Sequence, residues 1–75
     1  MNEQASPMQP EEFRAALAIV GLSISRAAPL LGISVRQARR WAAGTSPINL
    51  ASAKLLRLMV RGTIPVWQDE RVTTL

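Results

Sequence analysis

The chain has 75 residues, of which 48% are hydrophobic, so it can form one small folded domain and is not expected to be disordered throughout. It contains no cysteine, which excludes disulfides and thiolate metal sites, and no histidine or tyrosine, which leaves few groups for acid–base chemistry. These absences argue against an enzyme, and we predict no catalytic residue, metal site or cofactor.

The formal net charge of +4 is distributed unevenly along the chain. All five acids lie near the two ends. The stretch 13–62 holds no acid and eight basic residues: Arg14, Arg26, Arg36, Arg39, Arg40, Lys54, Arg57 and Arg61. Charge of one sign over so long a stretch indicates a polyanionic partner, either nucleic acid or an anionic membrane surface. The simpler alternative is a solvated basic surface.

Residues 1–9 are polar and lack the basic and apolar regions of a signal peptide, so we predict a flexible N-terminal arm. The first helix is predicted to begin at Pro10, because proline is favoured at the first helical position, and to end at Gly21. Apolar residues recur at helical spacing along it. The face expected to be buried consists of Phe13, Ala16, Leu17 and Val20.

A short second helix is predicted over residues 22–32, with either Ser23 or Ser25 as its N-cap and Gly32 as its end. Pro29 would lie inside this helix if Ser23 were the cap, and it would remove one backbone hydrogen bond there. A short, late-starting or bent helix is therefore expected. Its inner face is predicted to consist of Ala27, Leu30 and Leu31.

The segment ISVRQARRWAAG, residues 33–44, predicts a third helix between an N-cap at Ser34 and an end at Gly44. Plotted at about 100° per residue, its side chains separate into two opposite groups. The group expected to face the core is Ala38, Trp41 and Ala42. The outward group is Arg36, Arg39, Arg40 and Ala43, with Val35 and Gln37 on the flanks.

A fourth helix is predicted from about Leu50 to Arg61, with Ser46 or Asn49 as its N-cap and Gly62 ending it. A basic stripe runs along it, formed by Lys54, Arg57 and Arg61. Its apolar residues span about 200° of the circumference, which exceeds what one side of a small core requires. The additional apolar residues could all be buried within the same chain, but we favour a dimer interface. The residues assigned to that interface are Leu55, Leu56, Met59, Val60 and Trp67.

Two short helices joined by LGIS predict a helix-turn-helix unit over residues 23–43. Ala28 is small enough to let the two helices approach closely, and Gly32 permits the sharp turn. The second helix of such a unit fits the major groove of DNA, where arginine can bind guanine through O6 and N7. The side chains expected to lock the two helices together are Ile33, Ala38 and Trp41.

The stretch LSISRAAPLLGISVRQARRWAAG resembles the helix-turn-helix of Cro/XRE-type transcriptional regulators. The flanking segments PEEFRAALAIVG and SPINLASAKLLRLMVRG resemble small bacterial and phage members, so the similarity covers residues 10–62. The resemblance implies an all-α, lambda-repressor-like domain of four to five short helices, usually a homodimer that represses its own or a neighbouring operon. Pro29 departs from the pattern and puts the second helix's usual phosphate contacts in doubt. The base-reading residues implied by matching position are Ser34, Val35, Arg36, Gln37, Arg39 and Arg40.

The leading hypothesis is therefore a dimeric, sequence-specific regulator that binds an inverted-repeat operator in double-stranded DNA, in the cytoplasm and associated with the nucleoid. Additional phosphate contacts are assigned to Ser25, Arg26, Thr45, Lys54 and Arg57. The alternative is an antitoxin-like or other protein-binding module in which the fourth helix and the tail, residues 63–75, dock a partner protein. A role on anionic membranes is weaker, because glycines divide the chain into short helices and no segment is expected to span a membrane.

Overall fold

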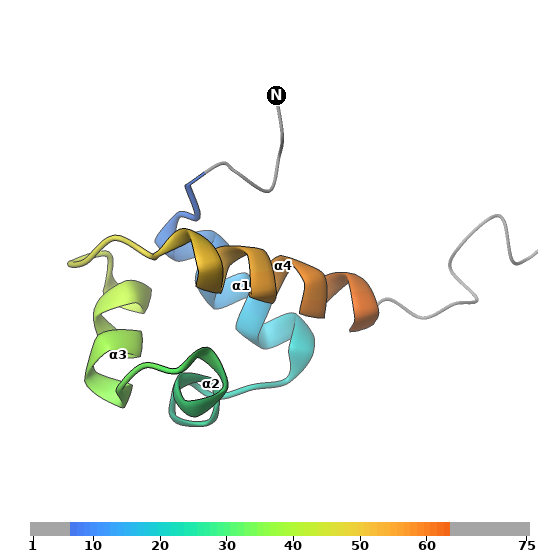
Figure 1. Ribbon diagram of the computed structural model, residues 1–75, viewed down its shortest axis with the longest axis horizontal. Helices are drawn as coiled ribbons and strands as arrows, with labels where there is room; N and C mark the ends of the chain where they lie inside the picture. The colour runs from blue at the N-terminus through green and yellow to red at the C-terminus, as the bar shows by residue number, and fades with distance from the viewer. Residues whose placement is uncertain (1–6, 64–75) are drawn as a thin grey trace, which may run out of the picture.

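The computed structural model describes residues 7–63, which form four α-helices and no β-strand (Figure 1). The helices are α1 (Pro10–Val20), α2 (Ile24–Leu31), α3 (Val35–Ala43) and α4 (Leu50–Thr63). Figure 1 shows α4 running alongside α1, with α3 near one end of this pair and α2 beneath it in this view. The prediction of a small all-α domain is confirmed. The tail beyond Thr63, including Trp67, lies outside the described residues, as do residues 1–6.

Short polar side chains begin three of the helices by accepting a bond from a backbone N–H that has no partner within the helix. Ser23 Oγ accepts from Arg26 N at 3.1 Å, so Ser23 and not Ser25 is the cap of α2. Asn49 Oδ1 accepts from Ser52 N at 2.8 Å, so Asn49 and not Ser46 begins α4. The predicted cap of α3 at Ser34 is confirmed.

Of the alternatives expected for α2, the short helix is observed, and it begins early, because the cap at Ser23 places Ile24 in the first turn and Pro29 inside the helix. The missing N–H of Pro29 removes one bond from a helix of only eight residues, which Gly32 then ends. The chain turns sharply before α2, since the axes of α1 and α2 lie at 98° to each other. This turn brings α2 beneath α1 and places α3 beside it.

Glycine ends α3 as predicted but does not end α4. Gly44 adopts φ 82°, a left-handed conformation in which a side chain would be strained, and an added Cβ would lie 3.1 Å from Pro10 Cγ. Gly62 keeps helical geometry, so the predicted end at this residue is wrong and α4 runs to Thr63. The Thr63 hydroxyl donates to the Met59 carbonyl at 2.8 Å, one helical turn earlier.

The core lies where α1, α3 and α4 meet. Phe13 and Trp41 pack edge to face, with ring centroids 5.8 Å apart and planes at 87°, an arrangement that aromatic rings favour. Leu56 of α4 is fully buried in the same cluster. The predicted inner residues of α1 and α3 are confirmed: Phe13, Ala16, Leu17, Ala38, Trp41 and Ala42 are buried. Val20 and Ile33 are only half-buried.

Two other burial predictions are wrong. Met8 is only 4% exposed and packs in the core, so the predicted flexible arm does not extend as far as this residue. Leu30 is 57% exposed, although the sequence placed it on the inner face of α2. The inward positions follow the i, i+3, i+4, i+7 spacing of one helical stripe, and Leu30 lies outside that stripe. These inward positions are Ile24, Ala27, Ala28 and Leu31.

Within residues 7–63 we find no single helix that is both long and apolar enough to cross a membrane.

Candidate nucleic-acid interface

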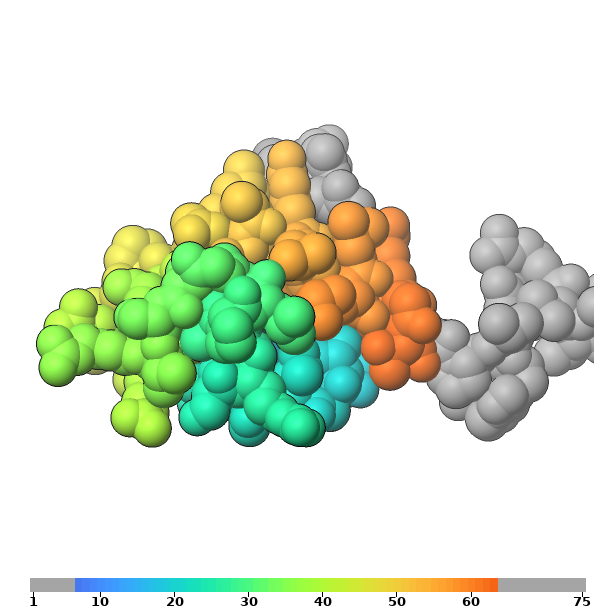
Figure 2. Space-filling view, turned by 60° about the horizontal axis from the view of Figure 1, so that its bottom comes forward, coloured from blue at the N-terminus to red at the C-terminus, as the bar shows by residue number. Residues whose placement is uncertain are grey.

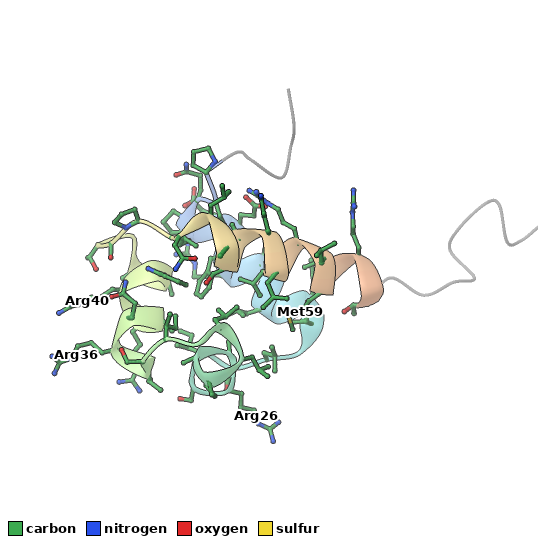
Figure 3. All side chains as sticks on the ribbon, in the orientation of Figure 1. Arg26, Arg36, Arg40 and Met59 are labelled. Carbon is green, nitrogen blue, oxygen red and sulfur yellow. The ribbon has the colours of Figure 1, made fainter. Side chains whose placement is uncertain are left out.

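The most concentrated positive charge on a single helix lies on the exposed side of α3. Arg36, Arg39 and Arg40 are all exposed, and Figure 3 shows Arg36 and Arg40 extending away from the body of the fold. Between residues 7 and 63, none of these three guanidinium groups pairs with a carboxylate. Their charge is therefore available to an anionic ligand.

The opposite side of α3 is held rigidly against the rest of the fold. Trp41 is 2% exposed and packs on Phe13 of α1. Ala28 and Ala38 are fully buried, and such small side chains let α2 and α3 pack closely. Figure 2 shows the surfaces of α2 and α3 side by side on one face of the molecule. α2 and α3 thus pack against each other across a short turn, and the arginine side of α3 faces solvent.

Arg14 of α1 fixes the C-terminal end of α3. Its guanidinium Nη1 donates to the carbonyl of Ala42, in the last turn of α3. A cation at this position also interacts favourably with the negative end of the helix dipole. This contact could not be predicted from the sequence, because the two residues lie 28 positions apart and neither belongs to a recognisable local motif.

The N-terminal end of α3 is fixed by two serines. Ser34 Oγ accepts from Gln37 N at 3.0 Å, which is the helix cap. Gln37 Nε2 donates to Ser46 Oγ at 2.9 Å, which joins α3 to the loop before α4. The C-terminal end of α3 is joined to the same loop, because Thr45 N donates to the Arg40 carbonyl at 3.0 Å. Both ends of α3 are therefore held by hydrogen bonds.

These contacts separate the predicted base-reading residues into two groups. The three arginines expose charged groups that, among residues 7–63, pair with no carboxylate. Ser34 and Gln37 are engaged in hydrogen bonds within the fold, and Val35 is half-buried. All six residues lie on α3 or at its N-cap. Within residues 7–63, the side chains of Arg36, Arg39 and Arg40 are exposed and make no hydrogen bond or ion pair.

The predicted phosphate-contacting residues do not form one group. Ser25 and Arg26 are exposed on α2, and Figure 3 shows Arg26 extending away from the fold. Thr45 directly follows the C-cap of α3 and its hydroxyl donates to the Arg40 carbonyl at 3.3 Å. Lys54 is exposed on α4.

Arg57 has a structural role that the sequence analysis did not predict. Its Nε and Nη2 donate to the two carboxylate oxygens of Glu12 at 2.8 and 2.9 Å, which ties α4 to α1. The hydrogen bond from Arg57, aided by its charge, holds the pKa of the Glu12 carboxyl below its usual value of 4.5, against the smaller opposing effect of burial. Assigning Arg57 to phosphate therefore needs correction, because a phosphate would have to displace Glu12.

The predicted dimer interface also needs correction. Leu56 is fully buried in the core of its own chain, so it offers no surface to a second chain. Met59 and Val60 are half-buried against that core, and Figure 3 shows Met59 on the side of α4 that faces the rest of the fold. Leu55 is 40% exposed and Leu58 is 53% exposed. The large apolar side chains exposed on α4 are therefore those of Leu55, Leu58 and Leu50, which is 44% exposed at the start of the helix.

No group of three or more acidic, histidine or cysteine side chains that could hold a metal ion occurs between residues 7 and 63. Comparisons of the chain with protein-family models, with curated proteins and with solved structures found no match.

Proposed function

We propose that the chain is a Cro/XRE-type regulator of transcription that binds double-stranded DNA by inserting α3 into the major groove. The observation that supports this proposal is the pair of opposite faces on α3. One face is buried against α1 and α2, and the other carries three arginines that lack an acidic partner among residues 7–63. Such a protein would act on the nucleoid in the cytoplasm.

The dimensions of α3 suit this role. Its nine residues correspond to a length of about 14 Å, and the major groove, about 12 Å wide, admits one α-helix. In this arrangement Arg36, Arg39 and Arg40 read bases, because a guanidinium can bind guanine O6 and N7 together. Additional phosphate contacts come from residues around α3 and on α4, namely Ser25, Arg26, Thr45 and Lys54.

A homodimer would present two copies of α3 to an inverted repeat whose half-sites lie about 10 bp apart or a multiple of that distance. The contact between the two chains would use Leu55 and Leu58, two of the exposed apolar residues of α4. Occupying a promoter in this way would repress the gene that the promoter controls.

Two single-charge variants test the assignment of roles. Arg39→Ala removes a predicted base contact, whereas Lys54→Ala removes an exposed cation on α4. We expect Arg39→Ala to weaken binding to a selected duplex by about 1–3 kcal/mol, with a smaller loss on a scrambled duplex. Lys54→Ala should weaken binding to both duplexes equally. Fluorescence anisotropy titrations measure both effects. An equal loss on both duplexes for Arg39→Ala would contradict its base-reading role.

A second candidate function is an antitoxin-like or other protein-binding module. The observation that favours it is the exposure of Leu55 and Leu58 on α4, since an exposed apolar strip is often a contact site for another protein. Sedimentation velocity of the purified chain distinguishes the two candidates. A stable dimer without a further protein supports the regulator, whereas a chain that stays in solution only with a partner protein supports the module.

A further inference from the structure

Gln37 is the one uncharged side chain on α3 whose chemistry is well suited to reading DNA. The amide of glutamine can bind adenine by donating to N7 and accepting from N6, which requires both ends of the amide in one orientation. In the structure, Nε2 of Gln37 instead donates to Ser46 Oγ at 2.9 Å, and both side chains are half-buried. This bond turns the amide toward the α3–α4 loop.

The position of Ser46 is well defined by its surroundings. Ser46 precedes Pro47, and a residue before proline is restricted to extended backbone conformations. On one side, Thr45 N donates to the Arg40 carbonyl, and on the other, Asn49 caps α4. The backbone of Gln37 is equally fixed, because its N–H donates to Ser34. The hydrogen bond therefore joins two constrained segments, so little conformational freedom is lost when it forms.

We propose that Ser46 holds Gln37 away from the DNA and so restricts direct base reading by α3 to its arginines. Ser46 is then a positioning residue that determines specificity, because it acts through Gln37 without touching DNA. The operator half-site would be specified mainly by guanine and would contain no adenine selected by Gln37. This proposal rests on the proposed DNA-binding role of α3.

Releasing Gln37 should add a base preference. In Ser46→Ala the amide loses its partner, and with a χ1 rotation it can extend beside Arg40, its neighbour one helical turn along. A bidentate glutamine–adenine pair corresponds to between about 5-fold and about 150-fold discrimination at one base pair. Ser46→Thr is the matched control, because it keeps a hydroxyl at the same position.

The test is selection of a random duplex library on wild type, Ser46→Ala, Ser46→Thr, Gln37→Ala and the double variant Ser46→Ala/Gln37→Ala. We expect the same guanine-based motif from wild type, Ser46→Thr and Gln37→Ala. Ser46→Ala should select an additional adenine, and the double variant should lose it again. If the double variant loses the additional adenine, the preference comes from the released Gln37 and not from a general loosening of the loop. A melting curve of each variant checks that it is folded.

Two results would overturn the proposal while leaving the proposed function intact. One is a motif that is identical in wild type and Ser46→Ala. The other is an adenine in the wild-type motif that Gln37→Ala removes, which would mean that Gln37 already reads DNA. A wild-type selection with no motif at all would instead contradict the proposed function, and the role of Ser46 would fail with it.

Discussion

Replacing Leu56 by alanine tests whether this residue belongs to the core of its own chain or to a contact between chains. The side chain is fully buried among residues of α1, α3 and α4. Truncation removes three carbon groups, each of which contributes about 0.8 kcal/mol by transfer from water, or about 2.4 kcal/mol together. The cavity left behind adds to this, so we expect a loss of about 3–4 kcal/mol in the free energy of unfolding.

That loss is large for a domain of this size, because small domains unfold at a cost of only about 0.05–0.15 kcal/mol per residue. Leu56→Ala should therefore lose a large fraction of the stability of the domain and unfold at a clearly lower urea concentration. Leu58→Ala is the control, since Leu58 is 53% exposed on the same helix and its truncation should cost less than about 1 kcal/mol. Urea titrations followed by circular dichroism measure both values. Equal and small losses, with dimerisation weakened only in Leu56→Ala, would refute the core assignment.

Two further predictions concern the contacts that hold α1 to α4 and to α3. Because the folded pKa of Glu12 is lowered, its pair with Arg57 stabilises the fold above the usual pKa of 4.5, and that stability is lost as the pH falls through the lowered value. The melting temperature of Glu12→Gln should therefore fall less steeply than that of the wild type below about pH 4.5. The pair should contribute at most about 1 kcal/mol to the free energy of unfolding, because it is exposed. A pH profile identical to that of the wild type would contradict the pairing. Arg14→Ala should lower the free energy of unfolding by about 1–2 kcal/mol, because the Ala42 carbonyl loses a charged donor. Arg61→Ala removes the same charge from an exposed site, and an equal loss in both variants would mean that the Arg14 contact contributes nothing.

The sequence predicted the helices well because their boundaries depend on local chemistry. Ser34 and Gly44 mark the two ends of α3, since a hydroxyl can cap the first turn and glycine can adopt the left-handed conformation after the last. The helical repeat likewise separated the buried Trp41 from the exposed arginines. These inferences need only residues within one or two helical turns of each other.

Predictions failed where a residue's environment depends on distant segments. Met8 lies in a polar segment with no periodic pattern, so its burial could not be predicted. Leu30 was misplaced because it stands next to Leu31, and which of two adjacent apolar residues faces inward depends on how α2 packs on the rest of the fold. Leu56 was assigned to a dimer because the sequence shows how wide an apolar face is, but not how much of it α1 and α3 cover.

The residues of the candidate site could be named from the sequence, but the hydrogen bonds that their side chains make within the fold could not. The sequence placed Gln37 beside the arginines, yet its bond to Ser46 depends on the path of the loop before α4. Arg14 was recognised only as part of the total charge, because its partner is a backbone carbonyl that has no signature in the sequence. Side-chain hydrogen bonds between separate elements thus decide which of the predicted residues remain available to a ligand.

The measurement that tests the central claim most directly is selection of a random duplex library on the purified wild-type chain at about 150 mM salt, followed by sequencing. The account predicts an inverted repeat with guanine-containing half-sites about 10 bp apart, or a multiple of that distance. Tight binding that yields no motif and disappears with modest added salt would contradict it. In that case, the arginines of α3 would supply only charge.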